Sequence, residues 1–277
     1  MGVTRVVAAL HLYRGPARPL VVKFGGTSVG TPARMRRAAR RVAAYTRAGH
    51  AVVVVVSAMG HRTDHILRWV NAVCGGPRPE GGEREVDRAV ATGEELSAGL
   101  MAAGLCALGV RATALRGGEA GVSVVGPFGG GRIREVRASR LRALLADGVV
   151  PVIAGFQGER EDGELVTLER GGSDITAVAV AAALGGAPCH IVTDVDAVYA
   201  ADPRMDAGAE RYTDLTHEEM LALAEGGAHV LHAGAARLAH ARGVPLRVYS
   251  FRAPIRRPGG TRVGGSAMAA DGVGEAP

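Results

Sequence analysis

The first residues suited to chemistry are a lysine, two glycines and two hydroxyl side chains within residues 23–28, KFGGTS. Glycines that follow a strand let backbone N–H groups approach a phosphate closely, and the start of the next helix favours an anion. Lys23 stands at the end of the same expected strand and can reach those phosphates. A plain strand-to-helix turn explains the pattern equally well, and the GxxxxGK[ST] order of a Walker A loop is absent. The run therefore predicts either a phosphate site or an ordinary turn.

Residues 170–176, RGGSDIT, combine an arginine, paired glycines and a Ser/Asp pair at the expected start of a helix. Ser173 or Asp174 alone could cap that helix by accepting its free N–H groups. Arg170 can in addition hold a carboxylate through two parallel hydrogen bonds. Because an arginine and two glycines exceed what capping requires, we favour a ligand-binding role for this run.

Polar residues also gather in residues 193–199, TDVDAVY, where another strand is expected to end, and residues 202–204, DPR, follow shortly after. Ligands of open α/β sheets bind outside the carboxyl ends of the strands. The DPR run alone is an ordinary turn, with proline in a permitted place. Taken together, the two runs indicate a ligand site more specifically than either does alone.

Residues 92–95, TGEE, lie inside an expected helix. A glycine there costs about 1 kcal/mol relative to alanine, which hints at close approach by another backbone or a ligand. On the pattern alone, solvated helix charges at Glu94 and Glu95 are the simpler interpretation.

Strands and helices that could position these residues alternate along the chain. Apolar runs predict strands at residues 20–24, 51–56, 149–154, 190–193 and 246–250, and helices are expected at residues 32–48, 64–73, 85–107, 174–184, 216–224 and 228–241. Purely apolar β-branched runs suit strands that are covered on both faces. The alternation predicts an α/β fold with a mostly parallel sheet. We expect one domain over residues 19–263, a poorly ordered leader over residues 1–18 and a flexible tail over residues 264–277.

Composition excludes several classes of protein. The net charge of +6 would suit nucleic acid, but the arginines are spread along the chain and only 4 % of residues are aromatic, so an anionic small substrate explains the charge as well. Three widely spaced cysteines predict neither a disulfide framework nor a zinc site, and they fit a reducing cytoplasm. We expect no membrane span, because no run of about 18 apolar residues occurs.

Six runs, which include the four described above, together resemble the ordered motif set of aspartokinases, over roughly residues 20–262. They are residues 23–29 (KFGGTSV), 57–60 (SAMG, with Thr63 and Asp64), 92–94 (TGE), 155–158 (GFQG), 170–174 (RGGSD) and 193–204 (TDVDAVYAADPR). The resemblance implies the amino-acid kinase fold, a three-layer αβα sandwich around an open, mostly parallel sheet. An N-terminal lobe would bind substrate and a C-terminal lobe the nucleotide. It also implies transfer of phosphate from ATP, with Mg²⁺, to the β-carboxylate of L-aspartate in amino-acid biosynthesis.

Roles follow from the resemblance position by position. Lys23 and Asp174 would be catalytic, and no metal ligand is assigned, because Mg²⁺ would be carried by the ATP phosphates. The substrate would be bound by Ser57, Thr63, Glu94, Phe156, Arg170 and Ser173. The nucleotide would be contacted by Lys23, Gly25, Gly26, Thr193, Asp194, Tyr199, Arg204 and His229. The resemblance further implies a homo-oligomer, expected to be a dimer.

Two positions depart from the aspartokinase pattern. His229 stands where relatives carry a lysine, and a neutral imidazole cannot replace a permanent positive charge on a phosphate, so we expect weaker ATP binding or a slower step. Glu169 replaces the usual glycine before RGGSD. It either influences the choice of substrate or points to solvent.

Aspartokinases commonly continue into paired regulatory ACT domains, and no ACT domain is expected here. We therefore expect no feedback inhibition by lysine or threonine. Two other functions stay open. One is an acyl-phosphate-forming kinase that acts on a different amino acid or aspartate derivative in a dedicated pathway. The other is a catalytically weak regulatory or binding homologue.

Overall fold

The computed structural model describes residues 18–76, 79–201, 205–206, 208–227, 230–255 and 258–265. The expectations for residues 1–17, for residues 266–277, and for Arg204 and His229 lie outside these ranges. The first strand begins at Arg18, the last residue of the expected leader. Within the described ranges, no helix has both the length and the apolar character that crossing a membrane requires.

The main sheet has eight strands in the order β12-β14-β13-β9-β1-β2-β6-β3. Its strands are β1 (Arg18–Phe24), β2 (His50–Val56), β3 (Ala112–Leu115), β6 (Val150–Ala154), β9 (Cys189–Thr193), β12 (Asp214–Leu215), β13 (Leu246–Ser250) and β14 (Thr261–Val263). All neighbouring pairs are parallel except β13 and β14, which are antiparallel. The mostly parallel sheet expected from the sequence is confirmed.

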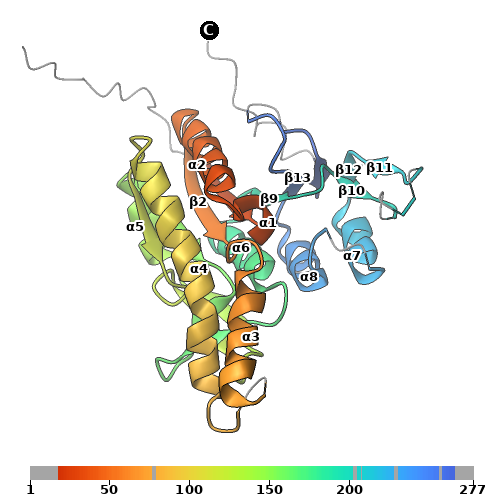
Figure 1. Ribbon diagram of the computed structural model, residues 1–277. Helices are drawn as coiled ribbons and strands as arrows, with labels where there is room; N and C mark the ends of the chain where they lie inside the picture. Colours follow the sequence, from red (N-terminus) through yellow and green to blue (C-terminus); the bar gives the residue numbers. More distant parts are fainter. Residues whose placement is uncertain are drawn as a thin grey trace, which may run out of the picture.

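Helices cover both faces of this sheet, and together they make three layers (Figure 1). The helices are α1 (Gly26–Val29), α2 (Pro32–Arg47), α3 (Arg62–Cys74), α4 (Glu83–Cys106), α5 (Ser139–Ala146), α6 (Gly172–Ala183), α7 (His217–Glu225) and α8 (Ala233–Arg242). Because side chains alternate along a strand, Val52, Val54 and Val56 pack with residues of α2 and α4. Val53 and Val55 pack with residues of α5, α6 and α8 on the other face. The αβα sandwich is therefore confirmed.

Two smaller sheets were not predicted from the sequence. One has four strands in the order β5-β4-β7-β8 and comprises β4 (Val122–Val125), β5 (Arg132–Val136), β7 (Gln157–Glu159) and β8 (Leu165–Thr167). The other pairs β10 (Val198–Tyr199) with β11 (Arg211–Tyr212). These strands are too short to produce a clear alternation of apolar and polar residues. The last expected helix also begins later, at Ala233, because His232 adopts an extended backbone and is its N-cap.

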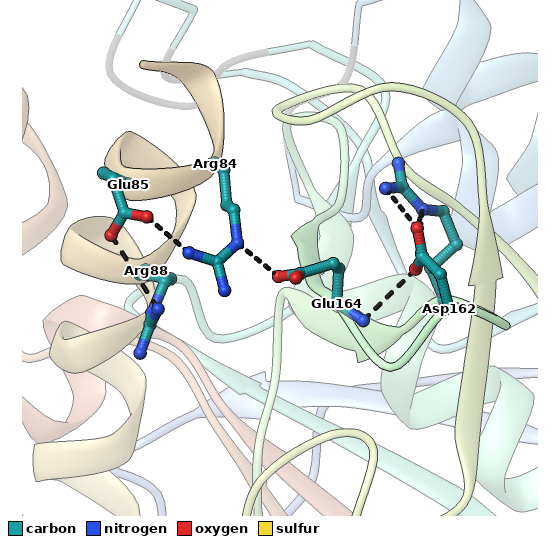
Figure 2. A network of polar contacts seen from close by, with 6 residues as sticks. Arg84, Glu85, Arg88, Asp162 and Glu164 are labelled. Atoms are coloured by element: carbon teal, nitrogen blue, oxygen red, sulfur yellow. Dashed lines mark hydrogen bonds and ion pairs between the residues drawn. The ribbon is translucent and has the colours of Figure 1, made fainter. Parts of the chain in front are cut away.

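Polar contacts hold the four-stranded sheet against the first turns of α4. The Asp87 carboxylate is fully buried, and its Oδ2 accepts hydrogen bonds from the backbone N–H groups of Gly129 (2.8 Å) and Thr167 (2.7 Å). Nearby, the Arg84 guanidinium lies between Glu85 and Glu164, 2.6 Å from each carboxylate (Figure 2). Exposed ion pairs typically contribute less than about 1 kcal/mol. The buried Asp87 is therefore the stronger connection between α4 and this sheet.

Candidate active site

The site lies at the point where the strand order of the main sheet reverses direction. From β1 the chain builds β2 and β6 on one side, whereas β9 and β13 lie on the other. Because β9, β1, β2 and β6 are parallel, their carboxyl ends share one edge of the sheet. Lys23 lies near the end of β1, Ser57 directly follows β2, and Thr193 ends β9. Such a switch point is the usual ligand position in an open α/β sheet.

A cavity of about 220 Å³ opens at this edge. It brings together most residues to which the sequence analysis gave a catalytic or substrate-binding role. Its lining comprises Lys23, Gly26, Ser57, Ala58, Gly60, Thr63, Glu94, Phe156, Gly171, Gly172, Ser173 and Asp174. No role was predicted from the sequence for Ala58, Gly60, Gly171 or Gly172, although all four lie inside its motifs. They could not be identified from side-chain chemistry, because alanine and glycine have no polar side-chain atoms and can bind a ligand by hydrogen bonds only through their backbone.

An ion pair joins the two residues that were expected to be catalytic. The Lys23 Nζ lies 2.6 Å from Oδ1 of Asp174, which belongs to the first turn of α6. Only 10 % of the Lys23 side chain and 13 % of the Asp174 side chain are exposed. An ammonium group held in this way, with restricted access of water, can stabilise negative charge that develops on a bound phosphoryl group.

Glu94 supplies a second, buried carboxylate to the cavity lining. It is 3 % exposed, and its Oε1 accepts a hydrogen bond of 3.1 Å from the Ala58 backbone N–H. Its other oxygen, Oε2, has no hydrogen-bond partner among the described residues. Burial raises the pKa of Glu94 from 4.5 to about 7. The solvated helix charge suggested by the pattern is therefore wrong for Glu94, and the cavity offers a carboxylate that suits a cationic group.

Two glycines let the loop after β2 approach the site closely. A Cβ atom at Gly26 would lie 2.7 Å from the Ala58 carbonyl oxygen, and one at Gly93 would lie 2.9 Å from the Ala58 Cβ. The close contact with Ala58 thus explains why glycine, which destabilises a helix, stands beside Glu94 in α4. Gly25 does not offer a free N–H group, because it donates a hydrogen bond of 3.1 Å to the Val192 carbonyl.

Phe156 connects the cavity to the four-stranded sheet. Its backbone has a φ of 65°, a left-handed conformation that is strained for an aromatic residue. Strain of this kind persists where surrounding packing imposes it and is concentrated at functional sites. The preceding Gly155 allows close packing, because a Cβ there would lie 2.9 Å from Cβ and Oγ of Ser173. The backbone at Gly155 and Phe156 therefore brings the Phe156 ring beside the start of α6.

Two neighbouring charged residues lie outside this cavity. Arg170 is exposed and does not line the cavity, although Gly171 next to it does. Glu169 is exposed as well and lines a separate groove between β5, α6 and α8. The position of Glu169 agrees with the interpretation that its carboxylate faces solvent rather than the substrate.

Of the residues expected to contact a nucleotide, Lys23 and Gly26 line this cavity, whereas Thr193, Asp194 and Tyr199 lie outside its lining, at the end of β9 and beyond it. The Thr193 hydroxyl donates to Oδ1 of Asp194 (3.2 Å), and the Tyr199 hydroxyl donates to Oδ1 of Asp196 (3.0 Å). Partial burial and the hydrogen bond to Asp196 raise the pKa of Tyr199. Asp196 also lies 3.4 Å from Nε of Arg211. Among the described residues, no three His, Cys, Asp or Glu side chains are grouped so that they could hold a metal ion.

Comparison with known proteins adds evidence independent of this geometry. Residues 18–250 match the model of the amino acid kinase family. The chain is 44 % identical to an aspartokinase of Thermus thermophilus over 231 residues, which is 83 % of this chain and 56 % of that protein. The chain therefore spans little more than half the length of the curated relatives it matches.

Solved structures give the same relationship. An aspartate kinase from Synechocystis superposes with a TM-score of 0.77 at 38 % identity, over 90 % of this chain and 40 % of that one. The aspartokinase III of E. coli, solved in complex with aspartate and ADP, superposes with a TM-score of 0.76 at 28 % identity. That match covers 88 % of this chain and 64 % of that one.

Proposed function

The chain belongs to the amino acid kinase family, and on this premise we propose that it phosphorylates the β-carboxylate of L-aspartate with ATP. The observation that carries the proposal is the single cavity that holds both the Lys23–Asp174 ion pair and the buried Glu94 carboxylate. The Lys23 ammonium suits a phosphoryl group, and the Glu94 carboxylate suits a substrate ammonium group. An amino acid with a second carboxylate meets both requirements.

Catalysis would consist of positioning and charge stabilisation. A carboxylate is already a competent nucleophile, so no general base is needed when its oxygen bonds to the γ-phosphorus, while the bond from that phosphorus to the β,γ-bridging oxygen breaks and ADP leaves. Lys23 would stabilise the negative charge on the transferring phosphoryl oxygens. Asp174, which holds the Lys23 ammonium at 2.6 Å, would keep that group in place and orient the reacting groups.

Substrate recognition would rest on both charged ends of the amino acid. The open Oε2 of Glu94 would accept a hydrogen bond from the substrate ammonium group. Arg170 is exposed at the turn into α6, and we propose that it reaches the α-carboxylate of bound substrate. Ser57, Thr63, Phe156 and Ser173 would complete the pocket.

The nucleotide would lie beyond β9, against Thr193, Asp194 and Tyr199, with its phosphates directed to Lys23 and the turn at Gly25 and Gly26. Arg204 and His229 belong to this proposal on the sequence resemblance alone. Mg²⁺ would neutralise charge on the phosphates. It typically keeps several waters and binds through phosphates and one or two carboxylates.

Trapping the acyl phosphate tests the proposal. The purified protein is incubated with ATP, Mg²⁺, hydroxylamine and either L-aspartate, L-glutamate, N-acetyl-L-aspartate or D-aspartate. We expect hydroxamate with L-aspartate and its loss in Lys23→Ala. N-acetyl-L-aspartate is the matched control, because it lacks the ammonium group that Glu94 would bind. A stronger signal with another acid would replace aspartate as the substrate, and no signal with any acid would favour a catalytically weak homologue.

We also propose a cytoplasmic homodimer. The exposed part of α4 is the surface we expect a second copy to cover, because Leu96 and Leu100 are 45 % and 42 % exposed and no charged residue occurs between them and Cys106. Cys74, Cys106 and Cys189 are unpaired, which fits a reducing compartment. Light scattering on the wild type and on a Leu96→Glu/Leu100→Glu variant measures the mass, and a monomeric wild type would contradict the dimer.

A further inference from the structure

The His232 imidazole occupies the space that a side chain at position 171 would need. A Cβ atom built on Gly171 would lie 2.1 Å from Cγ of His232 and 2.4 Å from its Cδ2. The ring therefore packs directly on the backbone of Gly171, which lines the catalytic cavity. No role was given to His232 by the sequence motifs.

Gly171 controls the start of the helix that carries Asp174. It is the N-cap of α6 and has a left-handed backbone with φ of 81°. Its carbonyl oxygen accepts hydrogen bonds from the N–H groups of Asp174 (3.0 Å) and Ile175 (3.3 Å). The direction in which α6 leaves this turn therefore sets where the Asp174 carboxylate meets Lys23.

The turn is clamped from two sides. His232 packs on Gly171, and on the next residue a Cβ atom at Gly172 would lie 2.9 Å from Cδ2 of Phe156. Phe156 lines the substrate pocket, whereas His232 is the N-cap of α8. A turn held by two rings has little freedom to rotate, because protein interiors are close-packed.

The orientation of the His232 ring is itself fixed. His232 is the N-cap of α8, and its Nδ1 accepts a hydrogen bond of 3.2 Å from the Gly234 backbone N–H. In the neutral ring the proton is then on Nε2, since the accepting nitrogen carries none. Gly234 packs closely on α6 as well, where a Cβ atom would lie 3.1 Å from Cδ1 of Ile175.

We propose that His232 is a positioning residue, whose imidazole holds the left-handed turn at Gly171 and thereby the Asp174 carboxylate against Lys23. This inference rests on the proposed kinase function. A helix cap alone would not require a ring, because asparagine, serine and aspartate serve as N-caps equally well. The ring is needed for the contact with Gly171.

The His232→Asn variant separates the two roles, because asparagine retains an acceptor for the Gly234 N–H and removes the ring. We expect kcat to fall 10- to 100-fold, the range that a misplacement of about 1 Å can cause. The KM for ATP should change less than about threefold. His240→Asn, in the same helix and on the surface, is the matched control and should leave kcat unchanged. A wild-type kcat in His232→Asn would overturn the inference.

A double-mutant cycle tests the contact itself. Gly171→Ala should lower kcat at least 100-fold in the wild type, because the new methyl group meets the ring. In a His232→Ala background the same change should cost less than about tenfold, since only backbone strain remains. Equal costs in both backgrounds would overturn the inference. A wild-type protein that makes no acyl phosphate would instead overturn the proposed function and with it the positioning role of His232 in catalysis. The thermal midpoints of the same four proteins would still report whether the contact between His232 and Gly171 exists.

Discussion

Replacing Glu94 by glutamine should stabilise the free protein at alkaline pH while it weakens aspartate binding. Glutamine has nearly the same shape, and its side-chain oxygen can still accept the hydrogen bond from the Ala58 N–H. The change removes a negative charge from a residue that is only 3 % exposed. It also removes the acceptor that the substrate ammonium group would use.

The magnitude follows from the pKa of Glu94, which burial raises from 4.5 to about 7. A raised carboxyl pKa means that the folded state binds the proton more tightly, so stability falls as pH rises from about 4.5 to about 7. At about 1.4 kcal/mol per pKa unit, the full difference is on the order of 3 kcal/mol. The Glu94→Gln variant avoids this loss, and for a chain of this size we expect its thermal midpoint at pH 8 to be higher by roughly 6–12 °C.

The assay is thermal unfolding of both proteins without ligands at pH 4.5 and pH 8, together with aspartate kinetics at pH 8. The two midpoints should agree at pH 4.5 and separate at pH 8. The KM for aspartate should rise at least about 30-fold, because removing one partner of a buried charge pair typically costs 2–5 kcal/mol. Glu95→Gln is the control, since the Glu95 carboxylate instead pairs with Arg116 at 3.1 Å. A variant that is less stable than wild type at pH 8, or one with an unchanged KM, would refute the reasoning.

Three further predictions follow from the same contacts. As the pH is lowered from 7 to 5, kcat/KM for aspartate should fall about tenfold per pH unit, because Glu94 is protonated. This decrease should be absent in Glu94→Gln. A flat pH profile in the wild type would argue against a role of the Glu94 charge. Gly93→Ala should raise the KM for aspartate, because the new methyl group would lie 2.9 Å from the Ala58 Cβ and displace the loop that binds Glu94. Gly104→Ala in the same helix should be neutral in the same kinetic assay, because its new methyl group would lie at an ordinary 3.5 Å from the Ala39 Cβ. Asp87→Ala should destabilise the protein by roughly 2–6 kcal/mol in denaturant unfolding, because two buried N–H donors lose their acceptor, and a loss below 1 kcal/mol would show that the Asp87 contacts do not hold the small sheet.

The large sheet could be predicted from the sequence because its central strands are covered on both faces. The valines of residues 52–56 are at most 1 % exposed, and they divide alternately between the two core clusters. Such a strand must be apolar throughout, so its sequence identifies it without knowledge of its neighbours.

The four-stranded sheet could not be predicted in the same way. β7 is only three residues long, and its Gly158 is required by a neighbour, since a Cβ there would lie 2.4 Å from Cγ1 of Val124. That contact depends on tertiary structure and leaves no periodic signal in the local sequence.

The candidate site was located by motifs but not explained by them. Lys23 and Asp174 were correctly placed at a strand end and a helix start, because both positions are marked by paired glycines two or three residues away. The burial of Glu94 could not be derived from its helix pattern, since the loop at Ala58 covers it from a different element. The packing of His232 on Gly171 could not be predicted for the same reason, because the two residues are the N-caps of two different helices.

The most direct test of the account is ³¹P NMR of the γ-phosphoryl group during turnover with ATP, Mg²⁺ and L-aspartate. Wild type should convert the γ-phosphate resonance of ATP into an acyl-phosphate resonance only when aspartate is present. Lys23→Ala, confirmed as folded by its circular dichroism, should leave ATP unchanged. Release of inorganic phosphate at a rate independent of aspartate, or equal turnover by wild type and Lys23→Ala, would contradict the proposal that this cavity transfers phosphate to aspartate.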